Sequence, residues 1–80
     1  MYLEIISPEK KVFAGEVTSV KVPGKEGVFE VLNNHAPIIS ALANGQVRVK
    51  DTAGKKMIFD INGGVVEVLK NKIVVLEEPV

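Results

Sequence analysis

The sequence predicts an all-β fold, a β-sandwich or flattened barrel that forms a single domain. Apolar and polar residues alternate with a period of two along most of the chain, and turn-forming residues recur at short intervals. Short strands with turns at this spacing are typical of sandwiches and barrels. No helical period is sustained along the chain, and its 80 residues suit one domain.

Five extended segments are expected in the first half of the chain. Leu3 and Ile5 share one face of the first. The second is a short piece that closes at Ala14-Gly15, and the third ends at Pro23-Gly24, because proline and glycine rarely continue a strand. The fifth follows Pro37, which disfavours a helical conformation at the residue before it. The expected ranges are 3–7, 12–13, 16–22, 28–32 and 38–42.

Two hairpins are expected in the second half. Asn44-Gly45 turns the chain into a strand in which Val47 and Val49 both point inward. Residues 51–54 form the loop of the first hairpin. Residues 62–64 are expected to form a hairpin turn between these two hairpins, and Gly63 and Asn71 suit turn positions with positive φ. The expected strands are 46–50, 57–61, 65–69 and 73–76.

The last two strands are apolar on both faces, although a sandwich of this size has one interior. Their outward side chains are therefore either covered by loops or exposed as a patch. An exposed apolar patch usually marks a surface that binds a partner. The sequence leaves both alternatives open.

The composition narrows the function classes. Ten basic and ten acidic residues cancel, so the chain has no overall field that would attract nucleic acid. Few aromatic residues and no tryptophan argue against a stacking platform for single strands. The absence of cysteine excludes disulfides and cysteine-based metal sites. No segment reads as a signal peptide or reaches the ~20 apolar residues that span a bilayer.

The only histidine, His35, is expected to have a structural role. A catalytic triad needs a nucleophile and an orienting acid beside the base, and no serine lies in a nucleophile-elbow pattern. One histidine without an acidic cluster cannot form a histidine-rich metal site. An imidazole can instead fix an irregular loop by hydrogen bonding to backbone groups. No catalytic residue, metal or cofactor is expected.

Two other motifs have simple structural explanations. The glycines of residues 23–27 suggest a phosphate loop, but the Gly-Lys-Ser/Thr ending and a following helix are missing. Lys56 lies near a hairpin, as the modified lysine of a carrier domain does, but it lies on the strand side of Gly54. Small barrels can bind nucleic acid or carry a prosthetic group, so a free-standing module with one of these roles stays open as the less favoured function.

An ordered set of motifs resembles the epsilon subunit of F-type ATP synthases over essentially the whole chain. The set consists of Pro23-Gly24, Gly27, Phe29, Asn34-His35-Ala36-Pro37, Leu42, Gly45, Val47, residues 63–68, Asn71 and residues 73–76. The resemblance implies a ten-stranded N-terminal β-sandwich, usually followed by two C-terminal helices. It also implies a non-catalytic rotor subunit of the central stalk, which couples ion-driven rotation to ATP synthesis.

The resemblance implies two partners and a location. The gamma subunit would contact Ser7, His35, Ile38, Ser40 and Leu42. The c-ring would contact Gly24, Lys25, Glu26, Gly27, Val28 and Phe29. The family often has an acidic residue where this chain has Val28, so Glu26 or Glu30 is expected to substitute. The subunit would lie at the cytoplasmic face of an energy-transducing membrane, the bacterial inner membrane, and reach it through the complex.

Residues 1–80 are expected to be one epsilon-type β-sandwich domain without the C-terminal helical pair. In the family these helices can inhibit ATP hydrolysis, and in some members they bind ATP. Neither the inhibitory brake nor ATP binding is therefore expected of these residues.

Overall fold

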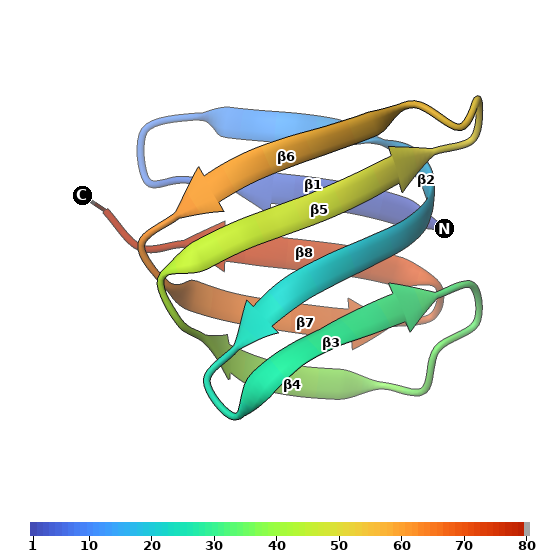
Figure 1. Cartoon of the computed structure of the whole chain (residues 1–80). Helices are drawn as coiled ribbons and strands as arrows, with labels where there is room; N and C mark the ends of the chain where they lie inside the picture. The colour runs from blue at the N-terminus through green and yellow to red at the C-terminus, as the bar shows by residue number, and fades with distance from the viewer. Residues whose placement is uncertain (80) are drawn as a thin grey trace.

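The computed structural model describes residues 1–79, which form eight β-strands and no helix. The strands lie in two layers that enclose the interior (Figure 1). The front layer consists of β6 (Lys56–Ile61), β5 (Gly45–Asp51), the second half of β2 (Lys11–Gly24) and β3 (Gly27–Leu32). The back layer consists of β1 (Tyr2–Ile6), β8 (Lys72–Glu77), β7 (Gly64–Leu69) and β4 (Ile38–Leu42). The predicted all-β sandwich is confirmed.

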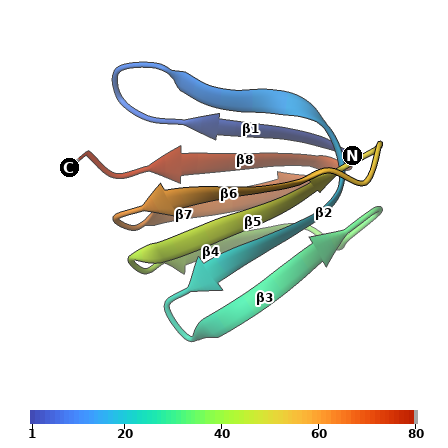
Figure 2. The ribbon, with the colours of Figure 1, turned by 45° about the horizontal axis from the view of Figure 1, so that its top comes forward.

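Strand β2 belongs to both layers. Its first half pairs with β1, and its second half pairs with β3 and β5. Figure 2 shows β2 passing beside β1, bending at one end of the molecule and returning between β5 and β3. The register against β5 shifts between Val17 and Ser19, which is the kind of irregularity that lets a strand bend.

The prediction of two strands separated at Ala14-Gly15 was wrong. Gly15 stays in the strand and lies opposite Leu3 of β1. Gly15 does not have the positive φ that a glycine turn uses, and it makes no turn. Residues 1–79 therefore contain eight strands, where the resemblance implied ten.

The back layer joins the two ends of the chain. β1 pairs in parallel with β8, β8 is antiparallel to β7, and β7 is antiparallel to β4. Strands β1, β8 and β4 therefore run in the same direction. The predicted extended conformation of residues 38–42 is confirmed by β4.

The core lies between the layers and is apolar. Val47 and Val49 point inward as predicted, and Phe13 and Phe59 pack with ring centroids 5.5 Å apart. No polar or charged residue is buried among residues 1–79. The buried hydrophobic residues that form the core are Met1, Leu3, Ile5, Val17, Val20, Val22, Val31, Leu42, Val47, Val49, Ile61, Val66, Val68, Ile73 and Val75.

The predicted positive φ is confirmed at Gly63 and Asn71, but the hairpin expected at residues 62–64 was wrong, because these residues connect β6 to β7 and the two strands do not pair. Gly63 and Gly64 have φ of 120° and 149°, and a side chain at Gly64 would overlap the carbonyl oxygen of Leu76. Lys70 and Asn71 have φ of 50° and 61°, the left-handed pair of a type I′ hairpin. In the other hairpin, Asp51 Oδ1 accepts hydrogen bonds from backbone amides of the loop.

The described residues contain no helix that could cross a bilayer. The predicted end of the domain, Val80, lies outside them.

Candidate functional site

The outward side of the back layer carries a row of apolar side chains across four strands. Ala41 of β4 lies opposite Val65 of β7, Val65 lies opposite Leu76 of β8, and Leu76 lies opposite Ile6 of β1. Alternation places all of these on the side away from the core, because their strand neighbours are buried. Leu76 is 51% exposed.

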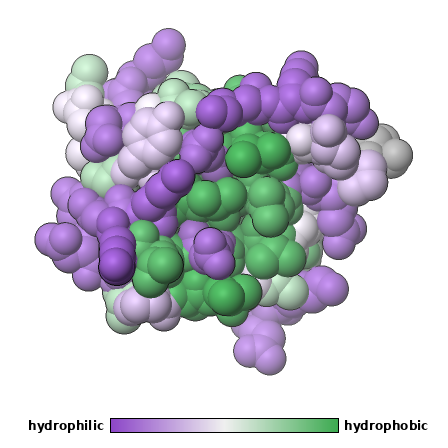
Figure 3. Space-filling model, turned by 180° about the vertical axis from the view of Figure 1, so that it is seen from behind, coloured by the Kyte–Doolittle hydropathy of each residue, from purple (hydrophilic) through white to green (hydrophobic). Residues whose placement is uncertain are grey.

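A second row lies beside the first. Ile39 of β4, which is 73% exposed, faces Glu67 of β7, and Glu67 faces Val74 of β8. Figure 3 shows this side of the molecule as a hydrophobic surface with a hydrophilic group near its centre. We call this surface the apolar face; its apolar residues are Ile6, Ile39, Ala41, Val65, Leu69, Val74 and Leu76.

Of the two alternatives that the sequence left open, the exposed patch is therefore the correct one. Val65, Leu69 and Leu76 are exposed, and no loop covers them in the described part of the chain. A contiguous apolar surface of this kind marks a site where another macromolecule binds.

A depression lies at the β4–β7 edge of the apolar face. Its volume is about 330 Å³. Apolar side chains form most of its wall, and Glu67 supplies the one carboxylate among the described residues that line it. The lining residues are Pro37, Ile38, Ile39, Glu67, Val68 and Leu69.

Glu4 lies at the opposite edge of the same face and is neutralised by two lysines. Its carboxylate accepts hydrogen bonds from Lys11 Nζ at 2.9 Å and from Lys72 Nζ at 3.1 Å. These two bonds, with that from Lys11 the larger cause, hold the pKa of Glu4 below its ordinary value. The same bond to Glu4 raises the pKa of Lys11.

Two predicted gamma contacts, Ser7 and His35, lie at opposite ends of the back layer. Ser7 follows the end of β1, which lies between β8 and the first half of β2, and its hydroxyl donates to the carbonyl of Lys10 at 3.1 Å. His35 precedes the start of β4, and its Nδ1–H donates to the carbonyl of Ala36 at 2.7 Å. Because β1 and β4 run in the same direction, these two residues lie at opposite ends of the layer. The predicted hydrogen bonding of His35 to the loop backbone is confirmed.

The other three predicted gamma contacts lie on the inward side of β4. Ile38 and Ser40 are half-buried, and Leu42 is 1% exposed. The side chain of Leu42 therefore belongs to the core and is not available to a partner in this structure. The outward residues of β4 are Ile39 and Ala41, which the sequence reasoning missed. The alternation that it used for the other strands would have separated these two sets.

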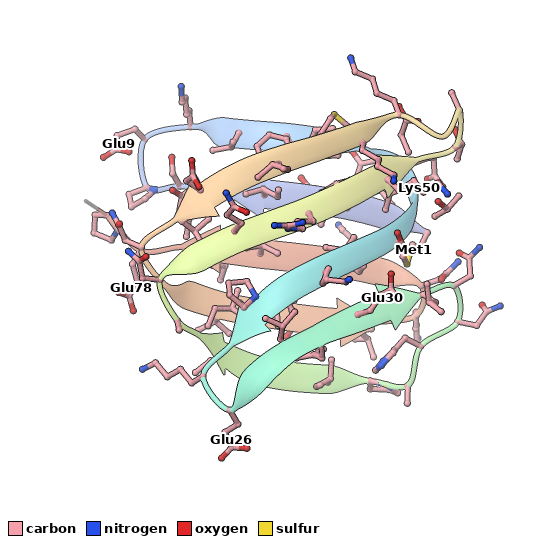
Figure 4. The ribbon with its side chains drawn as sticks, in the orientation of Figure 1. Met1, Glu9, Glu26, Glu30, Lys50 and Glu78 are labelled. Atoms are coloured by element: carbon pink, nitrogen blue, oxygen red, sulfur yellow. The ribbon has the colours of Figure 1, made fainter. Side chains whose placement is uncertain are left out.

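The predicted c-ring segment forms one compact hairpin. Gly24 lies opposite Gly27, and Lys25 and Glu26 make the turn. The Lys25 amide donates to the carbonyl of Ala41 at 3.1 Å, which holds the hairpin against β4. Figure 4 shows Glu26 at the tip, pointing away from the body of the molecule. Val28 is 67% exposed, whereas Phe29 packs inward over Gly24.

The outer side of the front layer is basic, although the whole chain is neutral. Four cations and one carboxylate surround a shallow depression of about 290 Å³. Lys50 and Glu30 lie on this side in Figure 4. The charged lining residues are Lys21, Glu30, Arg48, Lys50 and Lys56. Residues 1–79 contain no cluster of side chains suited to hold a metal ion.

Comparisons with known proteins identify the family. Residues 1–79 match the family profile described as "ATP synthase, Delta/Epsilon chain, beta-sandwich domain". A protein of Chlorobium limicola named ATP synthase epsilon chain is 44% identical over 78 residues, which cover 98% of this chain and 89% of that protein.

Two chains of solved assemblies have a similar fold. One, in a structure of the Euglena gracilis mitochondrial ATP synthase (OSCP/F1/c-ring), has a TM-score of 0.88 and 25% identity and covers 94% of this chain. The other, in the central stalk and c-ring of the Tetrahymena thermophila mitochondrial ATP synthase, has a TM-score of 0.82 and 15% identity and covers 99% of this chain. This chain spans 48% and 63% of their lengths. From the profile match and the curated relative we conclude that the chain belongs to the delta/epsilon chain family of ATP synthases, as an epsilon-type β-sandwich.

Proposed function

We propose that this chain is a non-catalytic subunit of the ATP synthase central stalk that docks on the gamma subunit through the apolar face. The observation that carries the proposal is the exposed apolar surface across β1, β8, β7 and β4. Leaving such a surface in water is unfavourable, and a partner that covers it recovers the free energy of burial.

The positions of Ser7 and His35 are compatible with docking on this surface. They lie beyond opposite ends of the back layer, so a partner that lies along the apolar face would approach both. Ile38 adds to this contact through the wall of the depression that it shares with Ile39. Ser40 contributes at the edge of β4, and Leu42 supports the strand from the core.

The hairpin of residues 24–29 is the second proposed contact, with the polar loops of the c-ring. Its tip is exposed and directed away from the body, and β4 holds its base. The family resemblance predicts an acidic contact at the position of Val28. Glu26 at the tip supplies the nearest carboxylate on the turn, and Glu30 supplies another further along β3.

The role that we assign to residues 1–80 is docking and transmission of ion-driven rotation. In the family that the sequence resembles, inhibition of hydrolysis and ATP binding belong to C-terminal helices, and residues 1–79 form strands alone. The proposed location is the cytoplasmic face of an energy-transducing membrane, which the domain reaches through its complex.

Leu76→Lys tests the proposal, with Ile58→Lys as its matched control. Leu76 is 51% exposed on the apolar face, and Ile58 is 55% exposed on the front layer. Leu76→Lys should alter the free energy of unfolding by no more than about 0.5 kcal/mol, because its side chain faces water. Ile58→Lys places a cation opposite Arg48 and should cost up to about 1 kcal/mol, which leaves the control folded. Leu76→Lys should weaken binding of the purified gamma subunit about 10-fold or more, because it places a charge in an apolar contact.

Calorimetric titration of gamma into each folded variant measures the difference. Equal affinity of the two variants would remove the apolar face from the contact. Absence of gamma binding by the folded wild-type chain would overturn the proposed function itself.

A further inference from the structure

Glu67 is surrounded by apolar side chains on the exposed face. Ile39 lies opposite it on β4, and Val74 lies opposite it on β8. Val65 and Leu69 flank it on its own strand, two residues away on the same side. A carboxylate in this position becomes desolvated when a partner covers the face.

No ion pair within residues 1–79 neutralises Glu67. Lys72, which faces the same side from β8, is 3.1 Å from Glu4 and is held there together with Lys11. A buried carboxylate without a counter-charge is strongly unfavourable, so a partner that covers Glu67 has to supply one.

The adjoining depression is shallow and open, and the chemistry of its lining indicates the group that would fit. Pro37, Ile39 and Leu69 line it with apolar surface, and Glu67 lines it with a carboxylate. Lysine and arginine combine a long apolar stem with a cationic end, and they pack the stem on apolar surface while the charge reaches a polar group. Their geometry matches this combination of apolar walls and one carboxylate.

We propose that the depression between β4 and β7 receives a single lysine or arginine side chain of the docking partner, with its stem against Ile39 and Leu69 and its charged end on Glu67. The apolar face then provides contact area, and the ion pair fixes the register of the partner on it. This inference rests on the proposed function, because it takes the partner to be the gamma subunit.

Glu67→Gln and Glu67→Lys test the inference in the full chain, and Asp60→Asn on the opposite layer is the control, because Asp60 is an exposed carboxylate of β6 outside both proposed contacts. Removal of one partner of a buried charge pair should weaken gamma binding about 30-fold or more for Glu67→Gln. Glu67→Lys should weaken binding further by placing two cations together. Asp60→Asn should bind as the wild type does.

A second arm locates the cation on gamma. Each surface lysine and arginine of gamma is changed to alanine, and each variant is titrated with both the wild-type chain and Glu67→Gln. One gamma variant should lose affinity for the wild type and show no further loss with Glu67→Gln.

The outcomes separate the two ideas. If gamma binds the wild type and Glu67→Gln equally, the inference is overturned while the proposed function stands. If Glu67→Gln binds weakly but no single basic residue of gamma couples to Glu67, then backbone donors of gamma satisfy this carboxylate. That outcome overturns the proposed lysine or arginine contact. If gamma does not bind the folded wild-type chain, both are overturned.

Discussion

At the scale of single residues, Glu4 holds the most constrained charge of the described chain. It lies on β1, and its two lysine partners come from the strands on either side, β2 and β8. The carboxylate therefore links three strands at the edge where the two ends of the chain meet. Its lowered pKa means that the folded state favours the ionised carboxylate more than the unfolded state does.

Glu4→Gln should remove a pH-dependent part of the stability. The pKa of Glu4 is lower in the folded state than in the unfolded state, where it is about 4.3. The stabilisation by ionised Glu4 is therefore fully present above the unfolded-state pKa and is lost as pH falls through the folded-state pKa. The wild type should therefore exceed Glu4→Gln in free energy of unfolding at pH 7, and the difference should shrink toward pH 2. Urea titrations across this range measure it, with Glu26→Gln as a control that removes a carboxylate from the hairpin tip. A difference as large at pH 2 as at pH 7 would contradict the ion-pair explanation.

At the scale of strands, alternation predicted most of the fold. It placed Val47 and Val49 in the core, and turn chemistry predicted the positive φ of Asn71. The prediction failed at Gly15, because a glycine is often part of a turn, whereas here it continues a strand and lies opposite Leu3 of β1. Whether a glycine ends a strand depends on the strand that pairs with it, and that pairing is not local in sequence.

The front layer contains a pairing that strand chemistry disfavours. Lys21 lies directly opposite Arg48, and Lys50 lies directly opposite Lys56. Like charges directly opposite each other in neighbouring strands are destabilising. These pairs could not be predicted from the sequence, because the balanced total charge hides the local excess of cations and the strand register determines which residues lie opposite each other.

Lys50→Glu should stabilise the domain. The change replaces a repulsive pair across β5 and β6 with an attractive one, and we expect a gain of about 0.5 kcal/mol in free energy of unfolding. Thermal unfolding at low and high salt measures it, and the gain should diminish in high salt because both groups are exposed. The double variant Lys50→Glu with Lys56→Glu restores a like-charge pair and should lose the gain. A double variant as stable as Lys50→Glu would show that the pairing is not the cause.

At the scale of the whole molecule, the candidate site is assembled from strands that are distant in sequence. Ile39, Leu69 and Leu76 come from three strands, and the pairing of β7 with both β4 and β8 brings them onto one face. The sequence predicted apolar residues on both faces of the last two strands, but only the sheet order reveals that β4 continues the same surface. The same sheet order shows that Glu67 is surrounded by apolar side chains, because its apolar neighbours lie on three strands.

The sheet order also indicates which strand joins last during folding. β4 pairs with β7 along its length and touches β2 at a single position, so it has no hairpin partner adjacent in sequence. Its pairing closes a loop that contains β5 and β6. Closing this loop costs chain entropy before the β4–β7 pairing contributes any favourable free energy. The β5–β6 hairpin closes a much shorter loop and forms locally.

Leu42→Val and Ile61→Val should distinguish the long-range pairing of β4 from the local β5–β6 hairpin in the order of folding. Both side chains are buried, Leu42 in β4 and Ile61 in the β5–β6 hairpin, and each loss of a methylene should cost about 1 kcal/mol. If β4 joins after the transition state, Leu42→Val should raise the unfolding rate about 5-fold and leave the refolding rate nearly unchanged. Ile61→Val should instead slow refolding. Stopped-flow fluorescence of Tyr2, the only tyrosine, follows both reactions, since it lies in β1 opposite Lys72 of β8. Slower refolding in Leu42→Val than in Ile61→Val would place β4 in the folding nucleus and refute this order.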